Sequence, residues 1–157
     1  EVVEVLLEHV KRVQRTENQN GEWYIPHVVE PAFGIDRIIW HLIDQSYQET
    51  QKGGEDYVLL NLPEIVAPVD VCVLPLFEKD GMEELAQQIH RELCNRKGVF
   101  SVYDASGSIG RRYARADEIG VPWCITVDHE SLSEGTVTIR DRNSGNQKRV
   151  SIDALPF

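Results

Sequence analysis

Residues 69–128 decide the fold of most of this chain: "VDVCVLPLFEKDGMEELAQQIHRELCNRKGVFSVYDASGSIGRRYARADEIGVPWCITVD". They open on an apolar run, residues 69–76, that is typical of a buried strand. Residues 82–98 then space their apolar side chains as a helix does and end on a glycine, a common helix stop. Two further apolar runs, 99–104 and 122–128, are separated by a second helical segment. The order strand, helix, strand, helix, strand predicts parallel strands joined by crossover helices.

Two antiparallel strands are predicted beyond this unit. Residues 136–142 and 147–153 flank "NSGN", which is a turn sequence. We therefore predict that residues 64–157 form a complete α/β domain, a mixed five-stranded sheet with flanking helices. The domain boundary is placed within "PEIVAP", residues 63–68, because a proline stands at each end.

The part before this boundary, residues 1–63, is expected to be the tail of something larger, because the chain starts in mid-element. Residues 1–13 fit a helix or a strand, and the pattern leaves both open. Residues 10–30 are predicted to form a hairpin around an Asn-Gly turn, with "WYIPHVV" as a strand. Residues 33–49 place their apolar side chains on one stripe, which predicts an amphipathic helix. "QKGGED" then predicts a loop, and "YVLLNLP" a short strand.

The composition excludes several classes of function. The formal net charge is -10, which argues against indiscriminate nucleic-acid binding but permits a local basic face for a specific RNA. No apolar run approaches the roughly 20 residues that span a bilayer, so no membrane partner is expected. The histidines lack metal-ligand spacing, so no metal site is expected. Cys72, Cys94 and Cys124 lie far apart among apolar neighbours, which predicts three buried thiols in a reducing compartment.

A basic loop is the first candidate site. Asp104 ends the second predicted strand, and the Gly/Ser-rich loop after it leads into Arg111, Arg112 and Arg115. In an open α/β sheet, ligands gather beyond the carboxyl ends of the strands, so this loop is a credible place for phosphates or exposed bases. The alternative is that the arginines pair with the acidic residues of their own helix on a solvated face.

A second basic cluster lies on the last two predicted strands. Its members are Arg140, Arg142, Lys148 and Arg149. Arg140 and Arg142 are two residues apart, so they share a face of their strand. Glu130 follows the third strand at the same expected edge, where a carboxylate can accept from base amino groups while arginines donate. The alternative is an edge strand that carries charge to prevent aggregation.

A third candidate is "EPAFGIDR", residues 30–37. Glu30 ends a predicted strand, a glycine opens the next helix, and Arg37 lies in its first turn. An arginine in this position can bind a phosphate chain or stack on a flat base, and a carboxylate can hold an ammonium group. The alternative is a capped helix with an ordinary surface arginine.

These segments together resemble a known family. "VVEPAFGIDRIIW", residues 28–40, looks like motif 3 of a class II aminoacyl-tRNA synthetase, in the form typical of archaeal and eukaryotic glycyl-tRNA synthetases. Three segments resemble the C-terminal anticodon-binding domain of the same enzymes: "APVDVCVLPL", "DASGSIGRRYARADEIGVPW" and "TIRDRNSGNQKRVSIDALP". The resemblance covers nearly everything from about Val10 onward, in the same order. It implies that residues 1–63 end an antiparallel α+β catalytic domain and that residues 64–157 are the anticodon-binding domain.

The resemblance also implies roles for single residues. Arg37 matches the arginine that contacts ATP phosphate and is the expected catalytic residue. Glu30 matches the glutamate that binds the amino group of glycine. Pro31 and Ala32 are expected beside it in the glycine-binding site, with Ala32 where the family usually has serine. The residues expected at the tRNA anticodon are Asp104, Ser106, Ser108, Arg111, Arg112, Glu130, Arg140 and Arg142.

The implied activity is ATP-dependent attachment of glycine to tRNA-Gly through glycyl-adenylate, in a cytoplasmic homodimer. Mg²⁺ would assist, with ligands expected outside this chain, and the fragment alone is expected to bind but not to catalyse. An alternative function of a different class is that of a non-catalytic relative, like the accessory subunit of mitochondrial DNA polymerase, which acts as a clamp on a polymerase. Arg37 and Glu30 speak against it, because a non-enzyme need not keep a nucleotide-binding arginine. A generic small-molecule module would leave both arginine clusters unexplained.

Overall fold

The computed structural model describes Val13, Arg15, residues 17–52 and residues 54–157. It divides into two compact units, Glu1–Gly34 and Ile35–Phe157, which are described separately. The second unit contains residues from both sides of the boundary expected at 63 and 64. That boundary stays a prediction.

The first unit holds a short antiparallel hairpin. Strands β1 (Glu17–Gln19) and β2 (Glu22–Tyr24) pair around Asn20 and Gly21, both at positive φ, as an Asn-Gly turn requires. The hairpin prediction is confirmed, but the strand expected to run through residue 29 ends at Tyr24. Pro26 has no N–H to donate to a ladder, which disfavours a longer strand. Of residues 1–13, where helix and strand were both open, only Val13 lies within the described residues.

The second unit begins with a helix that passes directly into a hairpin. Helix α1 spans Ile35–Ser46, and strands β3 (Tyr47–Lys52) and β4 (Glu55–Leu60) pair antiparallel. The helix was predicted to continue to residue 49, and residues 51–56 were predicted as a loop; both predictions are wrong. Pairing with β4 supplies backbone hydrogen bonds along the whole of β3, and this outweighs the local helical pattern. The apolar residues of α1 that remain exposed are Ile35, Ile38, Ile39, Trp40 and Ile43.

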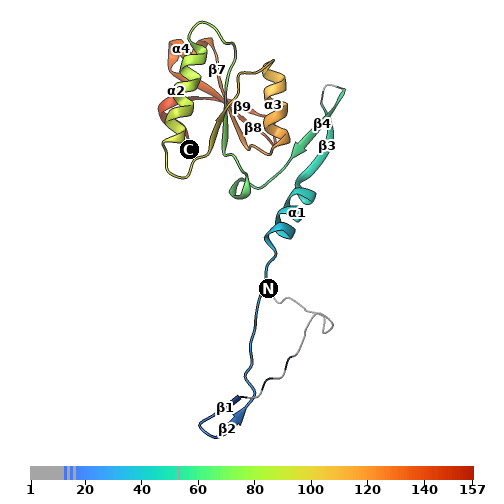
Figure 1. Cartoon of the computed structure of the whole chain (residues 1–157). Coiled ribbons are helices and arrows are strands. Elements are labelled where there is room, and N and C mark those ends of the chain that lie inside the picture. The colour runs from blue at the N-terminus through green and yellow to red at the C-terminus, as the bar shows by residue number, and fades with distance from the viewer. Residues whose placement is uncertain (1–12, 14, 16, 53) are drawn as a thin grey trace. The chain divides into compact units, whose positions relative to one another are not determined.

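The predicted mixed five-stranded sheet is confirmed, with strand order β6-β5-β7-β8-β9 (Figure 1). Its strands are β5 (Val71–Pro75), β6 (Ser101–Tyr103), β7 (Trp123–Val127), β8 (Thr136–Asp141) and β9 (Gln147–Ser151). Strand β5 pairs parallel with β6 and β7, whereas β8 pairs antiparallel with β7 and β9. The strands that alternate with helices in the sequence therefore form the parallel half of the sheet, and the hairpin around "NSGN" forms the antiparallel half.

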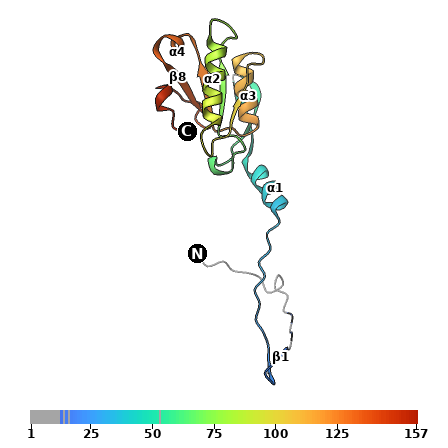
Figure 2. The same cartoon turned by 60° about the vertical axis from the view of Figure 1, so that its left-hand side comes forward.

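Helices cover both faces of this sheet. Helices α2 (Met82–Cys94) and α4 (His129–Glu134) lie on one face and α3 (Ile109–Glu118) on the other (Figures 1 and 2). Two 3-10 turns, Glu64–Val66 and Ile152–Ala154, complete the unit. Helix α4 was not predicted, because six residues are too few to show a period. This helix is stabilised at its N-terminus, where the Asp128 side chain and Ser131 form a reciprocal capping box.

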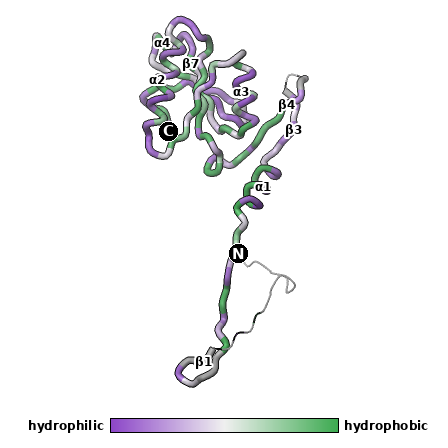
Figure 3. The backbone as a smooth tube through the Cα atoms, viewed as in Figure 1, coloured by the Kyte–Doolittle hydropathy of each residue, from purple (hydrophilic) through white to green (hydrophobic). Residues whose placement is uncertain are grey.

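Alternate side chains of the strands build two apolar clusters. The cluster under α2 contains Val71, Val73, Ile125, Val127, Val137 and Ile139 with Met82, Ile89 and Leu93. The cluster under α3 contains Cys72, Leu74, Cys124, Ala116 and Val121. Strands β5 and β7 are neighbours in the sheet and consist mostly of apolar residues, which Figure 3 colours green. Each fully buried aliphatic side chain contributes about 1.5–3 kcal/mol, so these strands stabilise the fold from both faces.

The cysteines only partly follow the prediction. Cys72 and Cys124 are buried, and burial raises the pKa of the Cys72 thiol to about 12. Cys94 is exposed, so the prediction of three buried thiols is wrong for this residue. It ends α2 immediately after the buried Leu93, where the next side chain turns away from the core.

A buried ion pair lies between α3 and the sheet. Both guanidinium Nη atoms of Arg140 donate to the two carboxylate oxygens of Asp117 at 2.8 Å, and the exposed fractions of the two side chains are 4% and 1%. The hydroxyl of Tyr57, from β4, donates to the same carboxylate. The Arg140 guanidinium also lies 4.9 Å from the centre of the Tyr113 ring. Strand β8, helix α3 and the hairpin β3–β4 are thus joined at one carboxylate.

Arg142 makes a second connection to residues before the predicted boundary. Its Nη1 donates to the carbonyl of Gly120 at 2.6 Å, and its Nη2 donates to the carbonyl of Leu62 at 2.6 Å and to Asn61 Oδ1 at 3.1 Å. The Arg142 side chain is 4% exposed and Leu62 is 6% exposed. The segment after β4 therefore packs as part of the α/β fold.

Removal of the hairpin is expected to lower stability. A chain that starts at Pro63 loses two acceptors of the buried Arg142 and the burial of Leu62, whereas a chain that starts at Tyr47 keeps both. We expect both to unfold cooperatively, the shorter one with a free energy of unfolding lower by about 2–5 kcal/mol. Urea unfolding followed by circular dichroism measures the difference, and equal free energies would show that residues 47–62 contribute nothing.

Loss of one partner of the buried ion pair is also expected to be costly. Arg140→Met leaves Asp117 buried without its cation, so the free energy of unfolding should fall by about 3–5 kcal/mol. The matched control is Arg149→Met on the neighbouring strand, whose ion pairs are partly exposed and should be worth about 1 kcal/mol or less. Similar losses in the two variants, measured in urea, would contradict a special role for the buried pair.

Candidate functional site

The carboxyl ends of the three parallel strands meet at one edge of the sheet. The chain leaves β6 through the loop into α3 and leaves β7 through the start of α4. The amino end of β8 lies at the same edge, because Thr138 pairs with Thr126 and Asp141 pairs with Trp123. Loops at the carboxyl ends of an open α/β sheet are where ligands usually bind.

The loop after β6 is ordered by the carboxylate of Asp104. The Asp104 N–H donates to the carbonyl of Val73 at 3.2 Å, and its Oδ1 accepts the N–H of Ser106 at 2.9 Å. Gly107 has φ +75°, a conformation that other residues rarely adopt. Ser106, Gly107 and Ser108 are exposed. Neither serine side chain hydrogen bonds to any residue that the structure describes, so their hydroxyls are available to a ligand.

Two of the three arginines that follow bind the protein itself. Arg115 donates from Nε and Nη2 to Asp104 Oδ2, at 3.0 and 2.5 Å, and from Nη2 to the carbonyl of Ser106 at 2.6 Å. Arg112 is 4% exposed and donates to the carbonyls of Gly107, at 2.6 Å, and of Pro75. The alternative that these arginines pair with acids of their own helix is therefore wrong.

Arg111 differs from its two neighbours. It lies in the first turn of α3 and is exposed. Within the part of the chain that the structure describes, its side chain forms no hydrogen bond or ion pair. It is the member of this trio that can meet a ligand without giving up an internal contact.

The charge of the loop is set by Asp104. Burial raises the pKa of its carboxyl, but the Ser106 N–H and the Arg115 guanidinium outweigh burial, and the pKa lies below its ordinary value. Asp104 is therefore ionised at neutral pH. Both its oxygens already accept hydrogen bonds, so it contributes to loop geometry before it contributes to any ligand.

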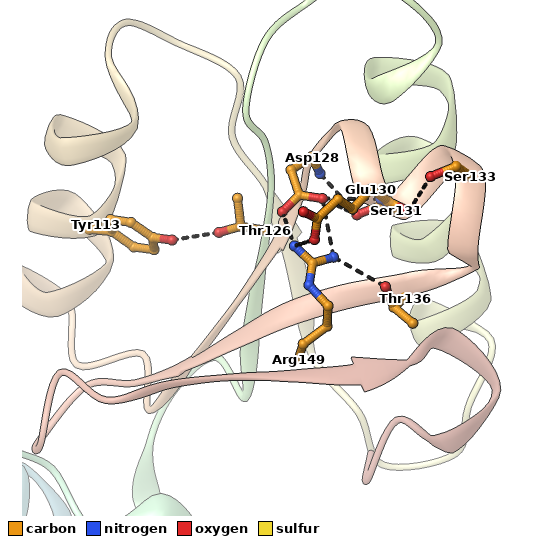
Figure 4. Close-up of polar contacts among 8 residues, drawn as sticks. All are labelled: Tyr113, Thr126, Asp128, Glu130, Ser131, Ser133, Thr136 and Arg149. Carbon is orange, nitrogen blue, oxygen red and sulfur yellow. Dashed lines mark hydrogen bonds and ion pairs between the residues drawn. The ribbon is translucent and has the colours of Figure 1, made fainter.

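A second polar group at this edge surrounds Arg149 (Figure 4). Arg149 Nη2 lies 2.5 Å from Asp128 and 2.9 Å from Glu130, and Nη1 donates to Thr136 Oγ1 at 3.1 Å. Burial raises the pKa of the Asp128 carboxyl, but the hydrogen bonds from Arg149 and Ser131 outweigh burial. The pKa of Asp128 therefore lies below its ordinary value. The result is one cation between two carboxylates, with Glu130 the more exposed of the two.

Two exposed aromatic rings border the same edge. Phe77, just after β5, and His129, which starts α4, have ring centroids 6.1 Å apart at an angle of 41°. Sequence reasoning missed both, and it assigned Arg149 to the basic cluster without a role. The only signal for Phe77 was a large aromatic directly after an apolar strand.

The structure separates the residues that the sequence grouped as anticodon contacts. Asp104, Ser106, Ser108, Arg111 and Glu130 lie at the carboxyl edge, and Arg112 lies beneath the loop. Arg140 and Arg142 do share a face, as predicted, but both are buried. Arg140 is bonded to Asp117 in the interior, and Arg142 lies at the opposite edge, beside the start of β7. These last two and Arg112 are buried and present no free guanidinium to an RNA.

The alternative that the second basic cluster lies on an edge strand is wrong for Arg140 and fits Lys148 and Arg149. Arg140 belongs to β8, which is paired on both sides and is not an edge strand. Its charge is neutralised inside the protein. Lys148 and Arg149 do lie on the edge strand β9.

The motif 3 candidates are all exposed. Glu30, Pro31 and Ala32 belong to the first unit, in a segment without regular structure, and Arg37 lies in the first turn of α1 in the second unit. The two units are described separately, and the roles expected for these residues at glycine and ATP stay predictions. Among the described residues, no group of three His, Cys, Asp or Glu side chains is arranged to hold a metal ion, and no helix has the length and hydropathy of a membrane span.

Comparison with known proteins places the chain in a family. A family model described as "Anticodon binding domain" matches residues 70–156. Glycine--tRNA ligase of Methanocaldococcus jannaschii is 48% identical over 97% of this chain and 26% of its own length. Glycine--tRNA ligase of Pyrococcus horikoshii is 44% identical over 94% of this chain and 25% of its own length. The chain thus spans about a quarter of these curated relatives.

A solved structure agrees with the fold. The RNA binding domain of threonyl-tRNA synthetase from Cryptosporidium parvum Iowa II superimposes with a TM-score of 0.55, at 25% identity, over 60% of this chain and 24% of that one. The family match covers the whole five-stranded sheet and its helices, including the loop at Ser106 to Ser108. The chain therefore belongs to the anticodon-binding domain family.

Proposed function

We propose that this chain is part of a glycine–tRNA ligase and that the carboxyl edge of its sheet binds the anticodon arm of tRNA-Gly. The observation that carries the proposal is the exposed Gly/Ser loop with Arg111, at the ligand edge of an anticodon-binding domain. The identity of 44–48% to glycine–tRNA ligases along nearly the whole chain supports the choice of tRNA.

The chemistry of this edge suits a single-stranded RNA loop. Unstacked bases expose donors and acceptors that a duplex hides, and they can stack on exposed rings such as Phe77 and His129. The hydroxyls of Ser106 and Ser108 can donate to base carbonyls or phosphate oxygens. Glu130 can accept from a base amino group. Arg111 supplies one cation in a protein whose formal net charge is -10, so attraction is confined to a small area.

In the whole ligase, the glycine carboxylate would attack the α-phosphate of ATP, giving glycyl-adenylate and pyrophosphate. A hydroxyl at the tRNA 3′ end would then attack the carbonyl carbon, giving glycyl-tRNA and AMP. Arg37 is proposed to donate to ATP phosphate oxygens, and Glu30 to accept from the glycine ammonium beside Pro31 and Ala32. Because Ala32 has no hydroxyl, one polar contact of the usual pocket is missing. The ligands of Mg²⁺ are expected elsewhere in the longer protein.

The homodimer and the cytoplasmic location implied by the family stay predictions. The polymerase-clamp alternative receives no support, because the relatives compared above carry the ligase name. The residues proposed for ATP and glycine remain the sequence feature that argues against a non-catalytic clamp.

Arg111→Ala is expected to weaken tRNA-Gly binding by about 1 kcal/mol, or roughly fivefold, because a phosphate contact is lost. The slope of log affinity against log salt should fall by about 1. Filter binding at two salt concentrations measures both. The control is Arg91→Ala, an exposed arginine on α2, across the sheet, which should leave both values unchanged. Equal effects of the two substitutions would show that Arg111 acts only through the general surface charge and makes no specific RNA contact.

Arg37→Ala in the full-length ligase is expected to slow ATP–pyrophosphate exchange at least about tenfold, because a charge-assisted phosphate contact is lost. The control is Gln45→Ala, an exposed residue in the last turn of the same helix. An unchanged exchange rate in Arg37→Ala would remove this residue from the ATP site while leaving the RNA-binding proposal intact.

A further inference from the structure

We infer that Asp104, Arg112 and Arg115 are positioning residues, which hold the loop Ser106–Ser108 in the shape that receives the RNA without contacting the RNA themselves. The inference rests on the proposed function of this edge and deepens it. It divides the residues near the loop into those that touch the ligand and those that fix the loop.

A loop of this composition needs external support. Gly107 stands between two serines, and a glycine loses more conformational freedom on ordering than any other residue. If the loop were mobile in the free protein, RNA binding would have to order it, and affinity would fall accordingly. Contacts that order the loop before RNA arrives therefore increase affinity.

The support comes from two directions. Arg115 bridges the Asp104 carboxylate and the carbonyl of Ser106 on the partly exposed side, with 44% of the Arg115 side chain accessible. Arg112, on the buried side, bridges the carbonyl of Gly107 and the end of β5 at Pro75. The loop is thus fixed both to its own strand and to the central strand of the parallel half.

These contacts also determine what the loop offers to a ligand. The carbonyls of Ser106 and Gly107 and both oxygens of Asp104 accept hydrogen bonds from the protein. What remains on the exposed side are the two serine hydroxyls and the cation of Arg111. Each serine hydroxyl can donate or accept and Arg111 can only donate, so the loop can bind phosphate oxygens and base carbonyls.

An unpaired N–H of Arg112 indicates that this residue does more than pack. Its Nε is buried and has no hydrogen-bond partner among the described residues. Burying a guanidinium with an unpaired N–H is unfavourable, so packing alone does not explain an arginine at this position. The two carbonyls that Arg112 holds belong to the loop and to the strand end beside it, which is where positioning is needed.

Asp104→Asn in the full-length ligase is the decisive test. It nearly preserves the size of the side chain but removes the charge that binds Arg115. By charge alone, removal of a carboxylate near the RNA should strengthen tRNA binding. We expect the opposite, a dissociation constant for tRNA-Gly raised about fivefold to tenfold, because the loop loses its order.

The matched control is Asp141→Asn. Asp141 performs the same local task in the turn between β8 and β9, where its Oδ1 accepts the N–H of Ser144 at 2.6 Å and the Ser144 hydroxyl at 2.9 Å. That turn lies at the opposite edge of the sheet. Asp141→Asn should therefore lower stability to a similar extent while leaving tRNA affinity unchanged.

A second variant and a second measurement separate positioning from folding. Arg115→Lys keeps the charge but loses the fork that bridges Asp104 and Ser106, and should weaken binding to a smaller extent than Asp104→Asn. Amide hydrogen exchange without RNA should rise at residues 105–108 in Asp104→Asn and stay unchanged in the core strands.

The outcomes are distinct. If the wild-type ligase does not bind tRNA-Gly, the proposed function fails. If it binds and Asp104→Asn binds equally well or more tightly, the positioning inference is overturned while the proposed function stands. Loss of affinity in Asp141→Asn as large as in Asp104→Asn would likewise overturn the inference, because general destabilisation would then explain both.

Discussion

The bidentate pair between Arg140 and Asp117 is the contact on which the arrangement of the second unit depends. It joins β8 to α3, and the Tyr57 hydroxyl brings the hairpin β3–β4 to the same carboxylate. Buried charges that far from water are tolerated only when each is paired and hydrogen-bonded, so the three elements are held in one geometry. Helix α3 is positioned by this contact near its end, and its first turn carries the loop at the ligand edge.

One helix therefore uses its basic residues for different purposes. Arg111 is exposed, while Arg112 and Arg115 bind backbone carbonyls and Asp104 around the loop. Arg149 at the same edge is compensated by Asp128 and Glu130. The protein thus presents little uncompensated positive charge, which fits selective contact with one RNA better than broad attraction to many.

Much of the fold could be predicted, because the apolar residues of residues 69–157 follow the periods of strands and helices. The five strands and the helices α2 and α3 fall where the pattern indicated. The errors were local. Helix α1 ends at Ser46 because Tyr47 pairs with Leu60 across a hairpin, and α4 was missed because its six residues depend on a capping box at Asp128. Pairing and capping are contacts that periodicity does not register.

The sequence by itself determined the α/β order, the position of the Gly/Ser loop and the family resemblance. It could not determine which arginines face solvent. Arg111, Arg112, Arg140 and Arg142 have the same side chain, and each stands in a segment that suits RNA contact. Only the tertiary structure placed a carboxylate or a set of carbonyls against three of them. The reason is that the partners come from distant parts of the chain, such as Asp117 for Arg140 and Leu62 for Arg142. The role of a guanidinium depends on the acceptors that folding brings within about 3 Å of it.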